Sequence, residues 1–263
     1  MEKLRLDNIS AVYQAQNGEV HALQNISFGV EEGEIASIVG PSGCGKSTLL
    51  SILAGLLRPT GGSVLVEGQR CAAARGSIGY MLQKDNLLAW RTIYQNVLLG
   101  LEIRHACTPK ALERAERLLH TYGLWDFRDK YPRQLSGGMR QRAALIRTLA
   151  VNPSILLLDE AFSALDYQTR LLVTDDVYAI LKAEHVTTLL VTHDIPESIS
   201  MGDKVVVLSH RPAVVQEILP IDFGAQRTPL TCRSNARFSQ YFDHIWKELT
   251  QDETQSNTAG PFA

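Results

Sequence analysis

The sequence contains little cysteine, no long apolar run and no excess of charge of either sign, and each shortage excludes a class of protein. The chain has 263 residues and four cysteines, namely Cys44, Cys71, Cys107 and Cys232. No two of them form a CxxC pair or another metal-ligand spacing, which argues against a cysteine-based metal site. A disulfide framework is not expected in a chain of this size. We therefore predict that the protein works in the reducing cytoplasm.

Membrane-spanning and secretory signals are also missing. No apolar stretch approaches the roughly 18 residues that a membrane-spanning helix needs. The N-terminus, MEKLRLDNIS, lacks the apolar core of a signal peptide, so we expect a protein that is neither secreted nor membrane-spanning by itself. The 26 basic and 28 acidic residues nearly balance, which predicts no nucleic acid partner.

Apolar runs of strand length alternate with helical patterns along most of the chain, and this alternation predicts an α/β fold. The first thirty residues alternate in polarity around Asn17-Gly18, which favours an antiparallel β hairpin. Helical runs separate the later strands, so we expect a mainly parallel sheet with helices on both faces. The runs expected to form strands are residues 34–39, 63–68, 77–83, 154–160, 187–194 and 204–209.

Helical patterns occur in residues 88–150, in the segment after the strand at 34–39 and near the C-terminus. Residues 88–150 predict a helical block inserted into the α/β core. The polar stretch 251–260, in contrast, lacks large apolar residues and is expected to be disordered. After the strand at 34–39, a helix is expected that carries Leu49, Ile52, Leu53 and Leu56 on one face. Near the C-terminus, a helix is expected to pack on its own domain through Phe238, Tyr241, Phe242, Ile245 and Trp246.

Residues 40–48, GPSGCGKST, fit the pattern G-x-x-x-x-G-K-[ST] between a predicted strand and a predicted helix. The glycines let successive backbone N–H groups turn toward phosphate oxygens, and the helix N-terminus adds positive potential. We expect Lys46 to reach the β- and γ-phosphates of ATP and Ser47 to ligate Mg²⁺. A glycine-rich turn with an exposed lysine is the structural alternative. The expected nucleotide loop comprises Gly40, Pro41, Ser42, Gly43, Cys44, Gly45, Lys46, Ser47 and Thr48.

An acidic pair follows the apolar run at 155–158. In a parallel sheet this order places Asp159 and Glu160 at the carboxyl edge, where ligands bind. We expect Asp159 to contact Mg²⁺ and Glu160 to act as the catalytic base for the attacking water. Such a pair is also typical of a solvated loop start, and the neighbouring P-loop favours the functional interpretation.

Two further polar residues follow apolar runs and are expected at the same edge. His193 comes after LLVT and can contact the γ-phosphate, with a purely structural histidine as the alternative. Gln83 ends the run at 77–83, and its amide can contact Mg²⁺ or the attacking water. We predict both as catalytic residues and Gln83 also as a metal ligand.

Residues 134–150, QLSGGMRQRAALIRTLA, contain a second glycine pair at the start of a predicted helix. Ser136, Gly137 and Gly138 form an anion-binding helix N-terminus suited to a γ-phosphate. The P-loop of the same chain already surrounds a triphosphate from one side, so this second helix start can face the nucleotide of another copy. We therefore predict a head-to-tail homodimer that encloses two ATP molecules.

Taken in order, GPSGCGKST, Gln83, LSGGMRQR, ILLLDE, SALD and His193 resemble the ATP-binding subunit of an ABC transporter. The resemblance covers roughly residues 4–220 and rests mainly on the highly specific LSGG stretch. It implies a P-loop NTPase core with a mainly parallel sheet, an N-terminal antiparallel β subdomain and an inserted helical subdomain. The expected single domain spans 1–220, and a short C-terminal helical extension with a disordered tail spans 221–263.

The resemblance adds two nucleotide-site residues and notes two departures. It implies that Tyr13 stacks on adenine, whereas strand periodicity alone indicates an ordinary aromatic residue of a β-strand. It also implies that Asp166 belongs to the loop joining the two sites of a dimer. Met139 stands where the family usually has glutamine, and Ala161 stands where proline is usual. We expect ATPase activity to be retained despite both changes.

DNLLAWRTIYQNVLLG (85–100) is similar to a stretch of nitrate, sulfonate and taurine importers that receives a helix of the membrane subunit. The resemblance implies that the Leu87–Trp90 region contacts two integral-membrane permease subunits, although Leu87, Leu88 and Trp90 can also cover the core locally. It further implies a separate solute-binding protein and a place on the cytoplasmic face of the cell membrane. The implied solute is a sulfonate, nitrate, taurine or vitamin precursor. The alternatives are an exporter's ATPase and a soluble ABC ATPase of a non-transport assembly system.

Overall fold

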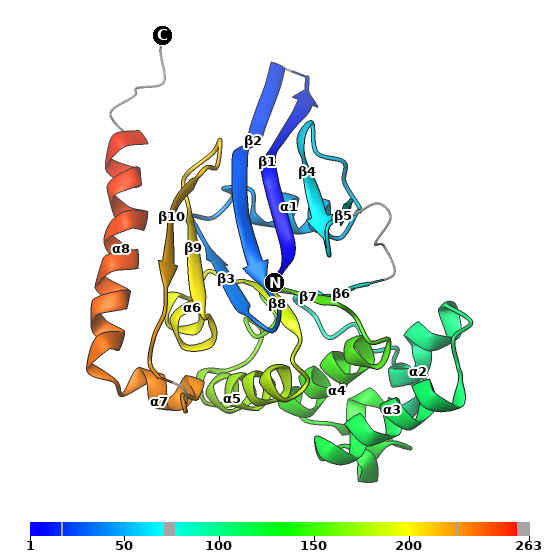
Figure 1. The fold of residues 1–263 in the computed structure, drawn as a ribbon. Coiled ribbons are helices and arrows are strands. Elements are labelled where there is room, and N and C mark those ends of the chain that lie inside the picture. Colours follow the sequence, from blue (N-terminus) through cyan, green and yellow to red (C-terminus); the bar gives the residue numbers. More distant parts are fainter. Residues whose placement is uncertain (17, 71–76, 225, 257–263) are drawn as a thin grey trace.

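The computed structural model describes residues 1–16, 18–70, 77–224 and 226–256, with side chains given up to residue 250 (Figure 1). An antiparallel sheet with the order β2-β1-β4-β5 contains much of the N-terminal part. Ala15 pairs with Gly18 at the end of the β1–β2 ladder, which confirms the predicted hairpin, and Asn17 lies outside the described residues. The strands are β1 (Glu2–Ala15), β2 (Gly18–Glu31), β4 (Gly61–Val66) and β5 (Gln69–Arg70).

A second sheet has the order β10-β9-β3-β8-β7-β6, and each neighbouring pair is parallel except β10 with β9. This mostly parallel sheet beside an antiparallel one confirms the predicted fold class. The carboxyl ends of β3, β8, β7 and β6 therefore meet at one edge, where the predicted site residues follow. The strands are β3 (Ile35–Val39), β6 (Ile78–Met81), β7 (Ile155–Asp159), β8 (Thr187–Val191), β9 (Lys204–Leu208) and β10 (Val215–Pro220).

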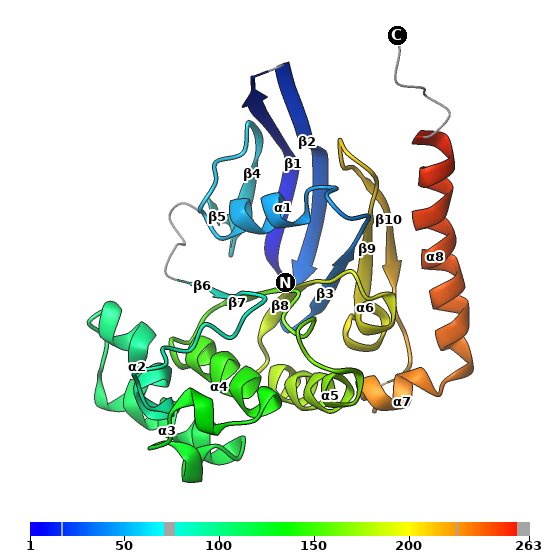
Figure 2. The ribbon, with the colours of Figure 1, turned by 180° about the vertical axis from the view of Figure 1, so that it is seen from behind.

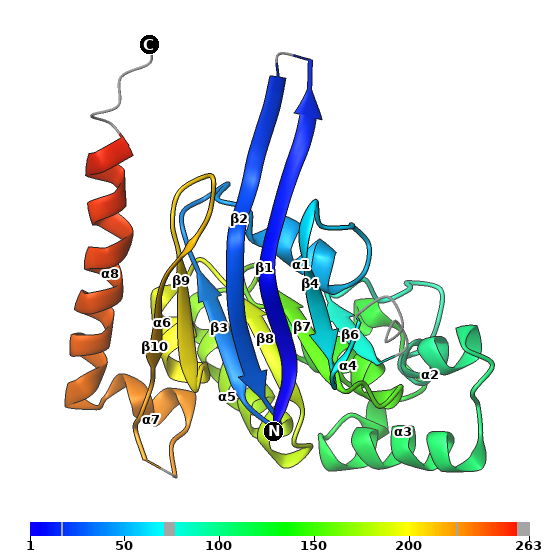
Figure 3. The ribbon, with the colours of Figure 1, turned by 45° about the horizontal axis from the view of Figure 1, so that its top comes forward.

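Helices cover the parallel sheet mainly on one face. The helices are α1 (Lys46–Leu53), α2 (Ile93–Ile103), α3 (Pro109–Thr121), α4 (Gly137–Ala150), α5 (Tyr167–Ala183), α6 (Ile195–Met201), α7 (Pro229–Arg233) and α8 (Ala236–Ser256). Figure 2 shows α4 and α5 below the sheet and α6 beside β9, with α2 and α3 projecting to one side. Figure 3 shows the long β1–β2 hairpin crossing the parallel strands on the other face.

The alternation of side chains along β3 explains these layers. Ile35 belongs to a core cluster with α2 to α5, whereas Ala36 and Ile38 belong to a cluster with α1 and the antiparallel sheet. Val39 returns to the first face and packs in a third cluster with α6 and α8. The expectation of helices on both faces is thus correct only in part, because the antiparallel sheet shares the second face with α1.

The prediction that Leu56 belongs to the apolar face of the helix after the P-loop is wrong. Leu49, Ile52 and Leu53 are buried, but the side chain of Leu56 is 74% exposed. The helix ends at Leu53, and Gly55 adopts a left-handed φ of 70°. A glycine in this conformation commonly terminates a helix, so the chain leaves the helical path before Leu56.

The C-terminal helix is longer than predicted. Helix α8 continues to Ser256, so residues 251–256 of the stretch expected to be disordered are helical, and the rest of that stretch lies outside the described residues. No glycine or proline interrupts the chain between Ala236 and Ser256, so nothing stops propagation of a helix that is already docked. Ile245 is fully buried, while Trp246 is 55% exposed. Among the described residues, no helix combines the length and apolarity required to cross a membrane.

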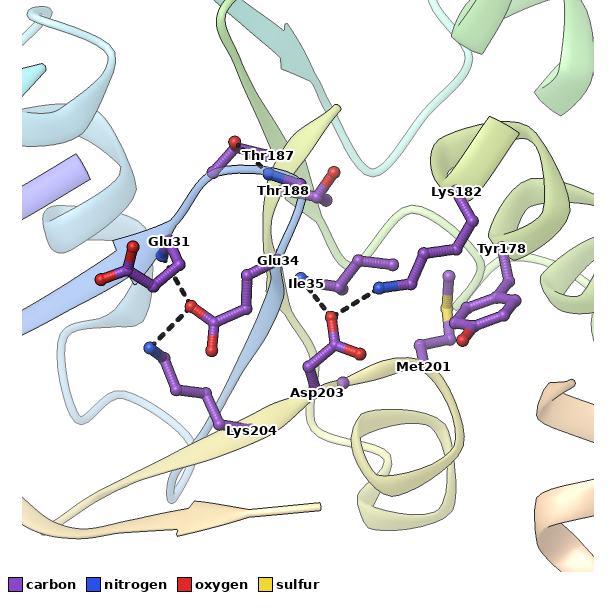
Figure 4. Close-up of polar contacts among 12 residues, drawn as sticks. Glu31, Glu34, Ile35, Tyr178, Lys182, Thr187, Thr188, Met201, Asp203 and Lys204 are labelled. Carbon is purple, nitrogen blue, oxygen red and sulfur yellow. Dashed lines mark hydrogen bonds and ion pairs between the residues drawn. The ribbon is translucent and has the colours of Figure 1, made fainter. Parts of the chain in front are cut away.

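A polar network closes the amino ends of the parallel strands, opposite the expected site (Figure 4). Asp203 accepts hydrogen bonds from the backbone N–H of Ile35 at 2.7 Å and from the Lys182 ammonium at 2.7 Å. The Arg227 guanidinium, which comes from the segment before α7, donates to the same carboxylate at 2.7 Å. Paired charges therefore stabilise the amino-end edge of the sheet, and the predicted site residues lie at the opposite, carboxyl edge.

Candidate nucleotide-binding and hydrolysis site

The loop between β3 and α1 has the conformation of a phosphate cradle. Gly43 and Gly45 have left-handed φ angles of 76° and 125°. A Cβ atom at Gly45 would lie 2.8 Å from a methyl carbon of Leu23 and 3.0 Å from the carbonyl oxygen of Ala22, so only glycine fits there. The Lys46 ammonium is buried and donates to the carbonyl oxygens of Gly40 at 2.6 Å and Pro41 at 2.9 Å.

A cavity of about 330 Å³ opens over this loop. Six of its lining residues belong to the predicted nucleotide loop, and the seventh, Glu160, is the predicted catalytic base. The eighth, Arg211, had not been singled out from the sequence. The full lining comprises Ser42, Gly43, Gly45, Lys46, Ser47, Thr48, Glu160 and Arg211.

Three neighbouring strands deliver the predicted catalytic side chains to this edge. Nδ1 of His193, two residues after β8, lies 3.2 Å from Oε1 of Glu160, directly after β7. The amide of Gln83, which follows β6, lies 3.5 Å from Oε2 of Glu160 and donates to the Ser163 hydroxyl at 3.1 Å. Glu160 adopts a left-handed φ of 46°, and its N–H donates to the Val191 carbonyl oxygen at 2.8 Å. The structure thus brings together the base, the histidine and the amide that the sequence suggested.

Asp159 has a partner that sequence reasoning missed. The hydroxyl of Tyr80 on β6 donates to Oδ2 of Asp159 at 3.0 Å. Burial raises the pKa of Asp159, and the hydrogen bond from Tyr80 counteracts this in part. Burial and the neighbouring carboxylate also raise the pKa of the Tyr80 hydroxyl. The contact between Tyr80 and Asp159 depends on β6 and β7 being neighbours in the sheet, and the sequence alone does not fix the order of the strands.

The residues expected to hold Mg²⁺ fit that ion chemically. They offer a hydroxyl at Ser47, a carboxylate at Asp159 and an amide oxygen at Gln83, and Mg²⁺ prefers oxygen ligands. Ser47 lines the phosphate cavity, and Asp159 lies close enough to Lys46 for that ammonium to oppose in part the rise that burial causes in the pKa of Asp159. The donor set is therefore suited to a hard divalent cation beside a bound nucleotide.

Tyr13 lies beside the P-loop helix. Its hydroxyl is 3.1 Å from the Thr48 hydroxyl oxygen, and its side chain remains 40% exposed. The long β1 strand therefore brings an accessible aromatic ring to the edge of the nucleotide loop. This position is compatible with the predicted stacking on adenine.

The second glycine pair starts helix α4, as predicted, and lies outside the P-loop cavity. Ser136 is the N-cap, and its hydroxyl accepts from the N–H of Met139 at 3.3 Å. Gly137 lines a separate cavity of about 370 Å³ together with Gln83, Arg140 and neighbouring residues. The two predicted anion-binding ends thus face different cavities within one chain.

Asp166 is the N-cap of α5. Its carboxylate accepts from the N–H of Thr169 at 3.0 Å, and hydrogen bonds from Thr169 lower its pKa. The side chain is exposed, so this local capping role leaves it accessible to a partner.

A buried glutamate supports the loop that carries His193. The Thr192 hydroxyl donates to Oε2 of Glu197 at 2.9 Å and accepts from the N–H of Asp194 at 3.0 Å. Glu197 is 3% exposed, and burial raises its pKa to about 7. Sequence reasoning missed this residue, which lies in an ordinary polar helix start. The two hydrogen bonds hold the Thr192 side chain and the backbone N–H of Asp194, the residues on either side of His193.

Comparisons with known proteins agree with this geometry. Residues 23–163 match the model of the ABC transporter family. The chain is 46% identical over 257 residues to the uncharacterized ABC transporter ATP-binding protein YtlC of Bacillus subtilis, covering 97% of this chain and 98% of that one. It is 37% identical over 261 residues to the nitrate import ATP-binding protein NrtD of Synechocystis sp., with 97% and 98% covered. The dimeric structure of MJ0796, a bacterial ABC transporter cassette, is similar with a TM-score of 0.70 at 31% identity, covering 84% of this chain and 100% of that one.

Proposed function

Because this chain belongs to the ABC transporter family and is an ATPase, we propose that it energises an importer of a small solute across the cytoplasmic membrane. The observation that carries the hydrolytic part is the convergence of Glu160 and the P-loop on one cavity. The import direction is supported by the 37% identity to a nitrate import protein over nearly the whole chain. The proposed solute class is accordingly nitrate-like, sulfonate-like or a vitamin precursor.

The proposed division of labour follows from the contacts. Backbone N–H groups of the loop after β3 and the Lys46 ammonium bind the phosphates. Glu160 accepts a proton from the attacking water, and His193 at 3.2 Å holds that carboxylate in place and contacts the γ-phosphate. The Gln83 amide positions the water from the other side of the carboxylate. When bound at Ser47, Asp159 and Gln83, Mg²⁺ supplies charge neutralisation to the phosphate oxygens.

We infer that the working unit is a homodimer. Gly137 and the P-loop line different cavities of one chain, so the start of α4 is free to complete the nucleotide site of a second copy. Asp166 is exposed near that start and is proposed to communicate between the two sites. ATP binding then closes the dimer and hydrolysis reopens it.

The proposed coupling surface is the Leu87–Trp90 region. Leu87 packs against the core cluster of the helical block, and the N–H of Leu88 donates to the Asn96 side chain at 2.7 Å. Trp90, in contrast, is 74% exposed. A rigid segment that presents one aromatic side chain suits a docking partner, here two permease subunits, which act with a solute-binding protein. We therefore propose that the chain works on the cytoplasmic face of the membrane.

The hydrolytic mechanism is tested with Glu160→Gln. The amide cannot accept the proton, so ATP turnover should fall at least about a hundredfold while ATP binding persists. An ATP-dependent dimer should then accumulate in size-exclusion chromatography. Glu19→Gln, on the exposed end of the hairpin, is the matched control. Normal turnover by Glu160→Gln contradicts the assignment of the base.

The coupling proposal is tested with Trp90→Ala in vesicles that also contain the permease. Solute uptake should be lost while nucleotide binding by the isolated ATPase is unchanged. Leu56→Ala is a matched control, because Leu56 is an equally exposed apolar side chain away from this surface. Unimpaired uptake by Trp90→Ala contradicts the proposed docking surface.

A further inference from the structure

Arg211 contacts the P-loop from a distant part of the chain. It follows β9, which ends at Leu208, and its Nε and Nη2 atoms donate to the carbonyl oxygen of Gly43 at 3.1 and 2.7 Å. A guanidinium that donates twice to one carbonyl holds that peptide in a fixed orientation. Gly43 lies between β3 and α1, outside any strand or helix, so Arg211 supplies a contact there that regular secondary structure does not.

The position of Arg211 also matters for charge. Among the residues that line the phosphate cavity, the charged side chains are Lys46, Glu160 and Arg211. Lys46 and Glu160 offset each other, so Arg211 makes this small group net positive. The influence of Arg211 reaches the loop interior: burial raises the pKa of the Cys44 thiol, and the charges of Lys46 and Arg211 oppose that rise. The guanidinium remains exposed, and within the described part of the chain its Nη1 has no hydrogen-bond partner.

We propose that Arg211 is a nucleotide-binding residue that holds the P-loop at Gly43 and adds a second positive charge for the phosphates of the nucleotide. This inference rests on the proposed nucleotide site. A guanidinium is always charged and carries five N–H groups, so it can keep its contact with the loop and still interact with a phosphate oxygen. The interaction adds to the ground-state binding of ATP and ADP alike, because Arg211 contacts the loop rather than the attacking water.

The experiment compares Arg211→Ala and Arg211→Lys with the wild type in calorimetric titrations with ADP. Arg211→Ala should bind ADP about tenfold more weakly, and Arg211→Lys, which keeps the charge, should lose no more than about threefold. The gap between wild type and Arg211→Ala should shrink when NaCl rises from about 50 to about 500 mM, because salt screens exposed charges. In steady-state kinetics the KM for ATP should rise while kcat stays within about twofold.

Arg237→Ala is the matched control, since Arg237 is also exposed and also donates to a backbone carbonyl oxygen, that of Asp222. Its ADP affinity should equal that of the wild type. The proposal is overturned if Arg211→Ala binds ADP as tightly as the wild type. It is also overturned if Arg211→Lys loses as much affinity as Arg211→Ala at every salt concentration, because the charge then contributes nothing. Failure of the wild type to bind ADP contradicts the proposed function instead. Should Arg211→Ala not fold, Arg211→Gln, which removes the charge but keeps a side-chain N–H donor, replaces it in the same titrations, and an ADP affinity equal to that of the wild type at about 50 mM NaCl overturns the proposal.

Discussion

Nδ1 of His193 lies 3.2 Å from Oε1 of Glu160, although the two residues are 33 positions apart in the sequence. The contact exists because β7 and β8 are parallel neighbours, with Asp159 opposite Val191. Each strand therefore ends at the same level, and the next residues meet above the sheet. The pair connects the proposed base to the loop after β8, and the hydrogen bonds around the buried Glu197 support that loop.

Replacement of His193 by alanine should reduce ATP turnover by about ten- to a hundredfold, because the Glu160 carboxylate loses its partner. The affinity for ADP should change little, since ADP has no γ-phosphate and His193 does not line the P-loop cavity. Phosphate release and ADP titration measure the two effects separately. His21→Ala, on the exposed hairpin, should behave as the wild type. Full turnover by His193→Ala refutes this role.

Tyr80→Phe removes one hydroxyl and leaves the ring. Without the donor at 3.0 Å, the half-buried Asp159 carboxylate loses its fixed orientation, so we expect turnover to fall about three- to tenfold. The Mg²⁺ concentration required for half-maximal activity should rise. Tyr94→Phe is the control, because Tyr94 makes a similar bond to Glu116 at 2.9 Å away from the site. Equal losses in both variants would point to a general effect of removing a tyrosine hydroxyl.

Gly138→Ala should destabilise the fold independently of ATP. A Cβ atom at Gly138 would lie 2.8 Å from a methyl carbon of Val173 on α5. Over-packing costs about 1–3 kcal/mol, and the better helix propensity of alanine returns roughly 1 kcal/mol. We expect a net loss of about 1 kcal/mol in chemical denaturation. In combination with Val173→Ala the loss should be smaller than the sum of the single losses, and strict additivity would contradict the proposed clash.

Glu197→Gln should change how stability depends on pH. Burial raises the pKa of Glu197 from 4.5 to about 7 in the folded protein. Between these values the folded state holds a proton that the unfolded state has released, so this group makes the wild type lose stability as pH rises. Glutamine cannot titrate, so the stability of Glu197→Gln relative to the wild type should increase from pH 5 to pH 8. Thermal unfolding across that range measures the difference, and a pH-independent difference excludes the effect.

Residues that follow strands were predictable because a local pattern sufficed. An apolar run ending in a polar residue places that residue at a strand end, which located Glu160 and His193. Tyr80 and Arg211 were not predictable in this way, since each acts on a partner from another strand or loop. The prediction for Leu56 was wrong for a local reason, because the helical spacing was extended past Gly55, where the helix terminates. The alternating polarity of the first thirty residues predicted the antiparallel hairpin, but the packing of its sheet on the second face depends on tertiary contacts that no local pattern encodes.

The two glycines at the start of α4, Gly137 and Gly138, have different physical roles. Gly137 lies beside the cavity with Gln83, whereas Gly138 is buried against α5. Sequence reasoning assigned both to anion binding. The structure gives Gly138 a packing role as well, so a side chain at this position is expected to cost stability even in the absence of nucleotide.

The salt-bridged Asp203 carboxylate gives the C-terminal segment a wider importance. Through Asp203, Arg227 is fastened to Ile35, the first residue of the strand whose far end leads into the phosphate cradle. A shortened protein that stops ahead of position 227 would leave a carboxylate short of one counter-ion at the root of that strand. The C-terminal segment therefore contributes to the stability of β3, because Arg227 holds the carboxylate that binds the first residue of that strand.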